Sequence, residues 1–283
     1  MLARICPNCI SGRAQSPVTL LLECPPEDAR MHPELQIWLN HFEYHAQHPR
    51  SIPSGLPDGL TGAERRLIAG SLATFQVGEH SLGRTLICAA RRFAHTRSMP
   101  ELERIVELLI REERRHADLL RDFMTDHFIP VRDLALTDLA FRAVRRLAGF
   151  ELYLHVLIAA ELIGNVYYRA LETVTGCQRL KVLCRTLVAD ELAHVAFESE
   201  LLRELRTHRP PVVQSALRFA HRTFFTCATL VVWSSHHAVL RAAGYRRARF
   251  ARVCHAQYAF YLGSGGSHLK NPQDALPATR TPQ

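Results

Sequence analysis

Apolar side chains recur every three or four positions through the middle of the chain, and groups of Pro and Gly separate these runs. This period places the apolar positions on one face of an α-helix. Two stretches match the capping box that opens a helix, Thr61 with Glu64 and Ser98 with Glu101. The pattern therefore predicts four long helices, over residues of about 61–93, 98–127, 137–175 and 178–207.

Shorter helical patterns flank these four. One fits Pro33 to His45, and two more follow Pro210. The two ends of the chain lack sustained periodicity, so we expect an irregular lead and a flexible tail there. The predicted organisation is an irregular segment 1–30, a single helical domain 31–262 with a core over about 61–207 and extra helices over about 212–262, and a tail 263–283.

Composition agrees with an all-α fold. Hydrophobic residues make up 47% of the 283 positions, enough for a sizeable core, and Leu, Ala, Arg and Glu dominate the middle of the chain. The most apolar stretch, residues 224–233, is about half as long as a membrane span, and the start lacks the pattern of a signal peptide. We therefore expect a soluble protein and no membrane.

Eight cysteines are scattered along the chain without the density of a disulfide scaffold, which predicts reduced thiols and a cytoplasmic location. The one close pair, Cys6 and Cys9, has no second pair at zinc spacing, so it does not by itself indicate a site. The formal net charge of +8 comes mostly from dispersed arginines. Solvated helix faces explain such a charge, although an acidic carrier protein would also suit it; a nucleic-acid partner is not favoured.

The chemistry is concentrated in two Glu-x-x-His turns, Glu113 with His116 and Glu191 with His194. Residues three positions apart share one face of a helix, and in both cases this is the apolar face. Burying an ionised carboxylate without a partner costs several kcal/mol, roughly speaking. A chain that does this twice at the same spacing needs a compensating charge, and a metal ion supplies one.

Each of the other two long helices places one Glu in its apolar stripe, Glu79 in the first and Glu161 in the third. Each lies upstream of its Glu-x-x-His turn by a similar interval, so the members of each helical hairpin fall near the same height at ~1.5 Å rise per residue. Four Glu and two His should therefore converge in the interior. Oxygen and imidazole donors without thiolate suit iron or manganese.

The order Glu, Glu-x-x-His, Glu, Glu-x-x-His resembles that of the ferritin-like di-iron carboxylate proteins, an antiparallel four-helix bundle here followed by additional helices. The resemblance covers about residues 61–207. It implies two bound iron ions, with a manganese and iron pair as the alternative. The ligands that it implies are His116 and His194 through nitrogen, Glu113 and Glu191 as bridging carboxylates, and Glu79 and Glu161 as terminal carboxylates.

Neighbouring residues extend the resemblance. Glu112 and Asp190 precede the two motif glutamates, where members of the family often hold an acid bonded to a ligand His. Gly164, one turn after Glu161, could leave room beside the metals, or could serve packing. Glu198, one turn after His194, is a candidate for the wall of a substrate cavity.

The function that the resemblance implies is an O2-activating oxidoreductase that hydroxylates, N-oxygenates or desaturates a small or carrier-bound substrate. No dinucleotide fingerprint occurs, so electrons would come from a separate reductase or ferredoxin. The p-aminobenzoate N-oxygenases carry an extra ligand His where Leu187 stands, whereas the acyl-carrier-protein desaturases resemble this chain in the acid before each motif Glu. Leu120 stands where a radical-forming Tyr would be expected in the ribonucleotide reductases.

Two other classes remain open. A ferritin-like protein that oxidises and stores iron would use the same ligands, but would form a shell of many subunits, whereas the oxygenase is expected as a monomer or homodimer. A metal-free bundle that serves protein interaction is the third interpretation. It predicts that loss of Glu113 or His194 leaves stability unchanged or improved.

Overall fold

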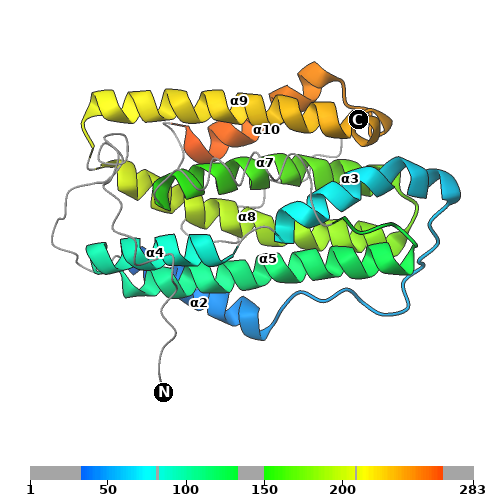
Figure 1. The fold of residues 1–283 in the computed structure, drawn as a ribbon, viewed down its shortest axis with the longest axis horizontal. Helices are drawn as coiled ribbons and strands as arrows, with labels where there is room; N and C mark the ends of the chain where they lie inside the picture. Colours follow the sequence, from blue (N-terminus) through cyan, green and yellow to red (C-terminus); the bar gives the residue numbers. More distant parts are fainter. Residues whose placement is uncertain (1–32, 81–82, 133–149, 208, 264–283) are drawn as a thin grey trace.

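The computed structural model describes residues 33–80, 83–132, 150–207 and 209–263. Every regular element in these segments is an α-helix, as the composition predicts. The helices, numbered as in Figure 1, are α2 (Pro33–Gln47), α3 (Gly62–His80), α4 (Arg84–Arg97), α5 (Pro100–Asp126), α7 (Phe150–Val174), α8 (Gln178–Thr207), α9 (Pro211–Ala242) and α10 (Arg247–Leu262).

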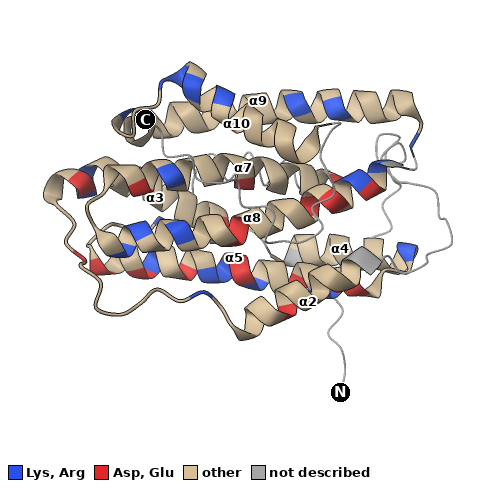
Figure 2. Ribbon diagram, turned by 180° about the vertical axis from the view of Figure 1, so that it is seen from behind, with Lys and Arg blue, Asp and Glu red and all other residues tan. Residues whose placement is uncertain are grey.

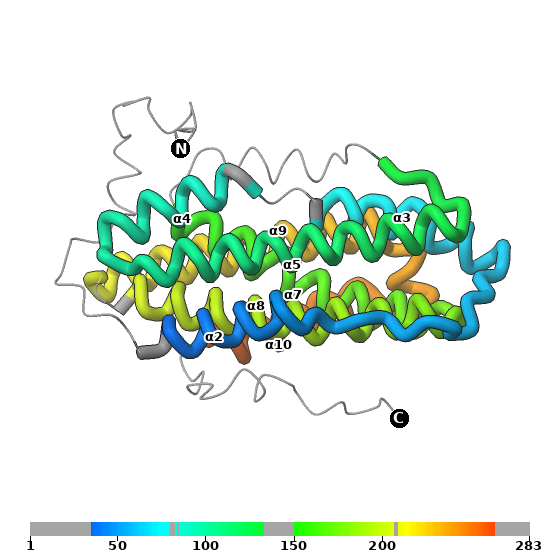
Figure 3. The backbone as a smooth tube through the Cα atoms, turned by 90° about the horizontal axis from the view of Figure 1, so that it is seen from below, coloured from blue at the N-terminus to red at the C-terminus, as the bar shows by residue number. Residues whose placement is uncertain are grey.

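Helices α7 and α8 form a hairpin through a short connection and pack along each other at the centre of the molecule. Helix α5 packs against α2, α3 and α4 on one side, and α9 with α10 covers α7 on the other (Figure 1). Between α2 and α3 the chain runs extended to the far end of the molecule (Figure 3). The four helices that carry the predicted ligands, α3, α5, α7 and α8, therefore lie between two covering layers.

The first long helix is interrupted, which corrects the prediction of one helix over about 61–93. Helix α3 ends at His80 and α4 begins at Arg84, with Gly83 between them in an extended conformation at φ 168°. Glycine in a helix interior costs roughly 0.5–1 kcal/mol relative to alanine, so the chain leaves the helix readily at this point. The break falls just after Glu79, which is thereby in the last turn of α3.

One predicted capping box is present and the other is wrong. At the start of α3, Thr61 Oγ1 accepts a hydrogen bond from the backbone N–H of Glu64 at 3.2 Å, and the Glu64 carboxylate accepts one from the backbone N–H of Thr61 at 2.8 Å. Ser98 instead ends α4 in the left-handed conformation at φ 52°. Helix α5 begins at Pro100 without a side-chain cap, because the fixed φ of Pro already suits the first helical position.

The third long helix ends as predicted, since α7 closes at Val174 just before Gly176, but residues 137–149 of the predicted helix lie outside the described residues. Helix α7 also has the length and hydropathy of a membrane span, and 89% of its most apolar window is buried in the protein. Such burial is typical of the core helix of a soluble protein. The stretch 224–233, the most apolar in the sequence, lies within α9.

Charge is distributed unevenly between the layers. Acidic and basic residues are interspersed along α5, whereas α9 and α10 carry Arg and no Asp or Glu (Figure 2). The cysteines in the described part of the chain form no disulfide. Reduced thiols are thus consistent with the described structure, while the pair Cys6 and Cys9 lies outside the described residues.

Candidate metal centre

The six predicted ligands lie together in the interior between α3, α5, α7 and α8. They form two overlapping groups, in each of which one ligand atom per residue lies within 4.8 Å of every other. Both groups share Glu113 and Glu191. The first group is Glu79, Glu113, His116 and Glu191, and the second is Glu113, Glu161, Glu191 and His194.

Because a carboxylate has two oxygens, a Glu that belongs to both groups can bind one metal with each of its oxygens. The rings of His116 and His194 stand 5.9 Å apart between centroids, one in each group. The arrangement provides two adjacent positions with one imidazole each, two carboxylates between them and one further carboxylate at either end.

Several ligand atoms are buried without a hydrogen-bond partner among the described residues. They are both carboxylate oxygens of Glu161, together with Glu113 Oε1, Glu191 Oε2 and His194 Nδ1. The last three make ion-pair contacts, since Glu113 Oε1 and Glu191 Oε2 lie 2.9 and 3.4 Å from His194 Nδ1, but these contacts lack the geometry of a hydrogen bond. Buried polar atoms are nearly always paired in native proteins, and a group of unpaired ones calls for an ion or a water. All of these atoms belong to residues of the second ligand group, so the donor set there fits a bound cation.

Each imidazole directs one nitrogen to the centre and the other to an acid on the opposite helix. His116 Nδ1 lies 3.1 Å from Glu191 Oε1, and its Nε2 lies 3.1 Å from Asp190 Oδ2. His194 Nδ1 lies 2.9 Å from Glu113 Oε1, and its Nε2 lies 3.1 Å from Glu112 Oε2. The predicted contacts of Glu112 and Asp190 with the ligand histidines are therefore present.

These acid contacts cross between helices. Asp190 on α8 orients His116 on α5, and Glu112 on α5 orients His194 on α8. An acid bonded to the far nitrogen of a ligand His fixes the tautomer and the ring orientation, leaving Nδ1 free to bind a metal. The crossing also ties α5 to α8 at the level of the site.

Two arginines surround this outer layer, and sequence reasoning missed both. Arg50 Nε lies 2.6 Å from Asp190 Oδ1, and Arg115 lies 2.5 Å from Asp190 Oδ2 and 3.4 Å from Glu112. Burial alone would raise the pKa of Asp190, but its bonds with His116 and the two arginines lower that pKa. Nothing in the sequence singles out Arg50, which stands in the extended segment after α2.

The inner carboxylates do not share one electrostatic environment. Burial alone would raise the pKa of Glu191, but contacts with both histidines outweigh burial and lower that pKa to about 2. Burial together with neighbouring carboxylates raises the pKa of Glu79 and of Glu161 well above the usual range. The histidine pKa values are raised although burial opposes this, because the carboxylates bond to the rings.

The net charge of the site indicates that bound cations would neutralise it. The outer layer pairs two acids with two arginines and is neutral. The inner layer has four carboxylates and two imidazoles, which together carry a charge of −4 when the carboxylates are ionised and the rings neutral. Two divalent cations would neutralise this charge within the same volume.

The two ends of the site differ. At one end the Tyr168 hydroxyl donates a hydrogen bond to the partly exposed Glu79. At the other end Glu198, which is 1% exposed, raises the pKa of Glu161, and neither of its carboxylate oxygens has a hydrogen-bond partner in the described structure. Glu198 thus lies near Glu161 at the buried end of the site, and its place in the wall of a substrate cavity remains a prediction.

Two further residues on α7 lie along the ligand face. A Cβ on Gly164 would meet the rings of Phe75 and Tyr168 at 3.9 Å, an ordinary packing distance, so this glycine is not required for close approach. Asn165 is fully buried, and both polar atoms of its side chain lack a partner among the described residues. The position of Asn165, one turn after Glu161, was a signal that sequence reasoning could have used.

A search of known protein families, a search of curated proteins and a search of solved structures each found no match to this chain.

Proposed function

We propose that this protein is a ferritin-like di-metal oxidoreductase that binds two iron ions and reacts with O2. The observation that carries the proposal is the pair of overlapping ligand groups that share Glu113 and Glu191. Each group contains one His whose far nitrogen already contacts an acid. Oxygen-rich sites with one imidazole per metal suit iron, and a manganese and iron pair is the alternative.

Glu113 and Glu191 would bridge the two metals, and His116 and His194 would bind one metal each through Nδ1. Glu79 and Glu161 would complete the two ends as terminal carboxylates. When bound, the reduced metal pair supplies the electrons and the open coordination positions with which O2 can react. The histidines and the shared carboxylates are buried, so the chain itself keeps water away from the reacting centre.

The more exposed end of the site gives a direction for access. Glu79 is partly exposed, whereas Glu161 and Glu198 are buried, so we expect O2 and substrate to approach from the Glu79 end. The Tyr168 hydroxyl is bonded to Glu79 there and can hold a proton beside the terminal carboxylate. The substrate would be a small or carrier-bound organic molecule that is hydroxylated, N-oxygenated or desaturated.

The remaining partners follow from charge and composition. Electrons would come from an external reductase or ferredoxin in the cytoplasm. An acidic carrier protein is a suitable partner for α9 and α10, where arginines occur without any Asp or Glu (Figure 2). We expect a monomer or homodimer rather than the shell of an iron-storage protein, because α9 and α10 cover one side of the ligand-bearing helices.

Metal analysis combined with O2 uptake tests the proposal. Protein reconstituted with iron(II) without oxygen should hold two irons per chain, show magnetic coupling between them by Mössbauer spectroscopy, and consume O2. Glu113→Ala should lose the coupling and most of the iron. Glu107→Gln on the solvent side of α5 should change neither.

A parent protein that binds no iron would end the proposal, and so would one that binds two uncoupled irons unaffected by Glu113→Ala. A large multi-subunit shell on a sizing column, filled by iron without oxidation of an organic substrate, would favour ferritin-like storage instead. Unchanged stability of Glu113→Ala in a parent without metal would favour an interaction bundle.

A further inference from the structure

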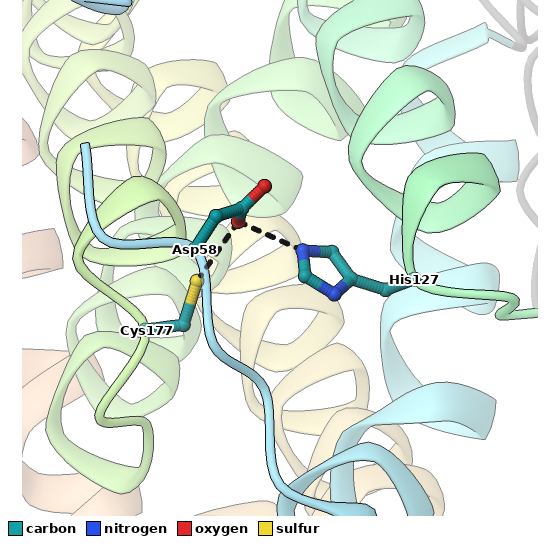
Figure 4. Close-up of side chains that lie close together, drawn as sticks. All are labelled: Asp58, His127 and Cys177. Carbon is teal, nitrogen blue, oxygen red and sulfur yellow. Dashed lines mark hydrogen bonds and ion pairs between the residues drawn. The ribbon is translucent and has the colours of Figure 1, made fainter. Parts of the chain in front are cut away.

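A second group of metal-binding side chains lies at the end of the molecule where α5 ends and α8 begins. Asp58 comes from the extended segment before α3, His127 follows the last turn of α5, and Cys177 precedes the first turn of α8. Figure 4 shows the three side chains pointing toward one another. His127 Nε2 lies 2.8 Å and Cys177 Sγ lies 3.3 Å from the same oxygen, Asp58 Oδ1, and all three ligand atoms lie within 4.8 Å of one another.

The backbone holds these residues in place. The carbonyl of Pro57 accepts hydrogen bonds from the backbone N–H groups of Gln178 at 3.0 Å and Arg179 at 3.4 Å, which fixes Asp58 against the start of α8. The sulfur of Cys177 accepts a backbone N–H bond from Leu180 at 3.5 Å. Burial and the hydrogen bond to Asp58 nevertheless raise the pKa of the Cys177 thiol, so a metal that binds there must displace its proton.

The charges around the group would be balanced by one bound cation. Arg179 lies 2.9 Å from the other oxygen of Asp58 and 2.7 Å from Asp126, so one guanidinium faces two carboxylates. With a thiolate at Cys177 the local charge is −2, and one divalent ion brings it to zero. The Asp58 oxygen that faces His127 and Cys177 is the one that Arg179 leaves available.

We propose that Asp58, His127 and Cys177 bind a zinc ion. Sulfur, imidazole and carboxylate donors together match the ligand preferences of zinc, which binds three protein ligands and a water when one position stays open. Water can reach this position because the Asp58 side chain is 36% exposed. As the zinc binds, the Cys177 thiol releases its proton to solvent.

This site is separate from the di-metal centre. His127 lies eleven positions after His116 on the α5 path, which corresponds to ~16 Å at 1.5 Å per residue. Its ligands join the extended segment before α3 to the ends of α5 and α8. Zinc there would fasten the end of the molecule and take no part in the reaction with O2.

Cobalt(II) substitution gives a readout specific to the thiolate. The experiment uses the full chain with Cys6→Ser and Cys9→Ser, so that the N-terminal pair cannot contribute. Cobalt bound to Cys177 should give an intense near-ultraviolet sulfur-to-cobalt band, whereas cobalt in the oxygen and nitrogen di-metal centre should not. Zinc should then displace the cobalt and remove the band.

Variants separate a ligand site from a structural contact. Cys177→Ser should abolish the band, and Asp58→Asn or His127→Gln should weaken cobalt binding by at least about tenfold. Cys227→Ser, at an exposed position on α9, should retain the band and the parent affinity. Asp126→Asn should also retain the band, because that carboxylate contacts Arg179 and none of the ligands.

The absence of a thiolate band in the parent would overturn the proposal, and so would a band that persists in Cys177→Ser. In those cases the three side chains form only a hydrogen-bonded contact. The outcome is independent of the di-metal proposal, since the band reports sulfur alone and is measured whether or not iron is bound.

Discussion

Replacing Glu161 with Gln should stabilise the metal-free protein and reduce the stabilisation that bound metal adds. Glu161 is 6% exposed, and neither of its carboxylate oxygens has a hydrogen-bond partner in the described structure. Without metal, burial and the neighbouring Glu198 disfavour its charge and raise its pKa. On folding without metal, Glu161 must therefore take up a proton that the unfolded chain does not hold at pH 7, whereas the neutral amide of Gln has the same shape and needs no proton.

The two effects have comparable size and opposite sign. Taking up a proton at pH 7 from an ordinary pKa of 4.5 costs up to about 3 kcal/mol, so the metal-free variant should gain about 1–3 kcal/mol. In the loaded protein one of four carboxylates is lost, and a ligand loss of at least about tenfold in affinity corresponds to at least about 1.4 kcal/mol per metal. A change of 1 kcal/mol shifts Tm by about 2–4 °C in a domain of this size.

Thermal unfolding followed by far-ultraviolet circular dichroism can measure both shifts, on protein treated with a chelator and on protein loaded with iron(II) without oxygen. Glu172→Gln is a matched control on the same helix, where a partly exposed carboxylate contacts Arg185. A surface pair contributes about 0–1 kcal/mol, so the control should change little and equally in both states.

The reasoning would be refuted if iron raised Tm by as much in Glu161→Gln as in the parent protein. If Glu161→Gln lowered Tm equally with and without iron, the carboxylate would be an ordinary part of the packing. If it raised Tm equally in both, the metal would not contact it.

Three further predictions address the surroundings of the site. Asp190→Asn should weaken iron(II) binding by about 10–100-fold, because it removes the acid that orients His116, and a titration of metal-free protein with and without the substitution measures this. Burial lowers the pKa of His236 from 6.5 to about 4. The free energy of unfolding therefore keeps its full value above pH 6.5, where the ring is neutral in both states, and falls by up to about 3 kcal/mol as the pH drops from 6.5 through 4. Urea unfolding between pH 7.5 and about 4 should show a smaller loss for His236→Asn, and an unchanged loss would contradict this assignment. Thr61→Ala should cost about 1 kcal/mol in the same assay through loss of the cap on α3, with Ser98→Ala as a control that removes no side-chain cap.

The convergence of the six candidate ligands could be predicted from the sequence because helical periodicity is local information. Glu113 and His116 share a face whatever the rest of the chain does, and the apolar residues around them show that the face is buried. Glu79 and Glu161 follow from the similar intervals in the two hairpins. Their metal-binding roles remain predictions, while their proximity is a property of the structure.

Features that depend on how helices meet could not be predicted in the same way. Glu112 and Asp190 were expected near ligand histidines, but their partners lie on the opposite helix, and only the angle and register between α5 and α8 determine that. Arg50 reaches Asp190 from a segment without periodicity. Ser98 followed the capping rule in sequence, yet its backbone ends α4 because the chain must reverse before Pro100.

The Asp58, His127 and Cys177 group is another feature that could not be predicted from the sequence. Each residue is unremarkable in its own stretch of sequence, since no two of them share a helix or a short motif. Their proximity arises from the length of the extended segment that carries Asp58 past α5 to the start of α8 (Figure 3). Sites built by such non-local contacts need the structure, whereas sites built from helix faces are visible in the sequence.

The outer and inner layers of the candidate metal centre have different charge partners. Arg50 and Arg115 neutralise the outer acids, so these acids can orient the histidines without adding charge to the centre. The inner carboxylates have no arginine of this kind among their described contacts, and their charge can be balanced only by protons or by metal ions. Metal binding should therefore release protons and tighten as the pH rises, because the raised pKa values of Glu79 and Glu161 describe protons that the metals must displace. Bound cations would then contribute to the stability of the core as well as to the proposed chemistry.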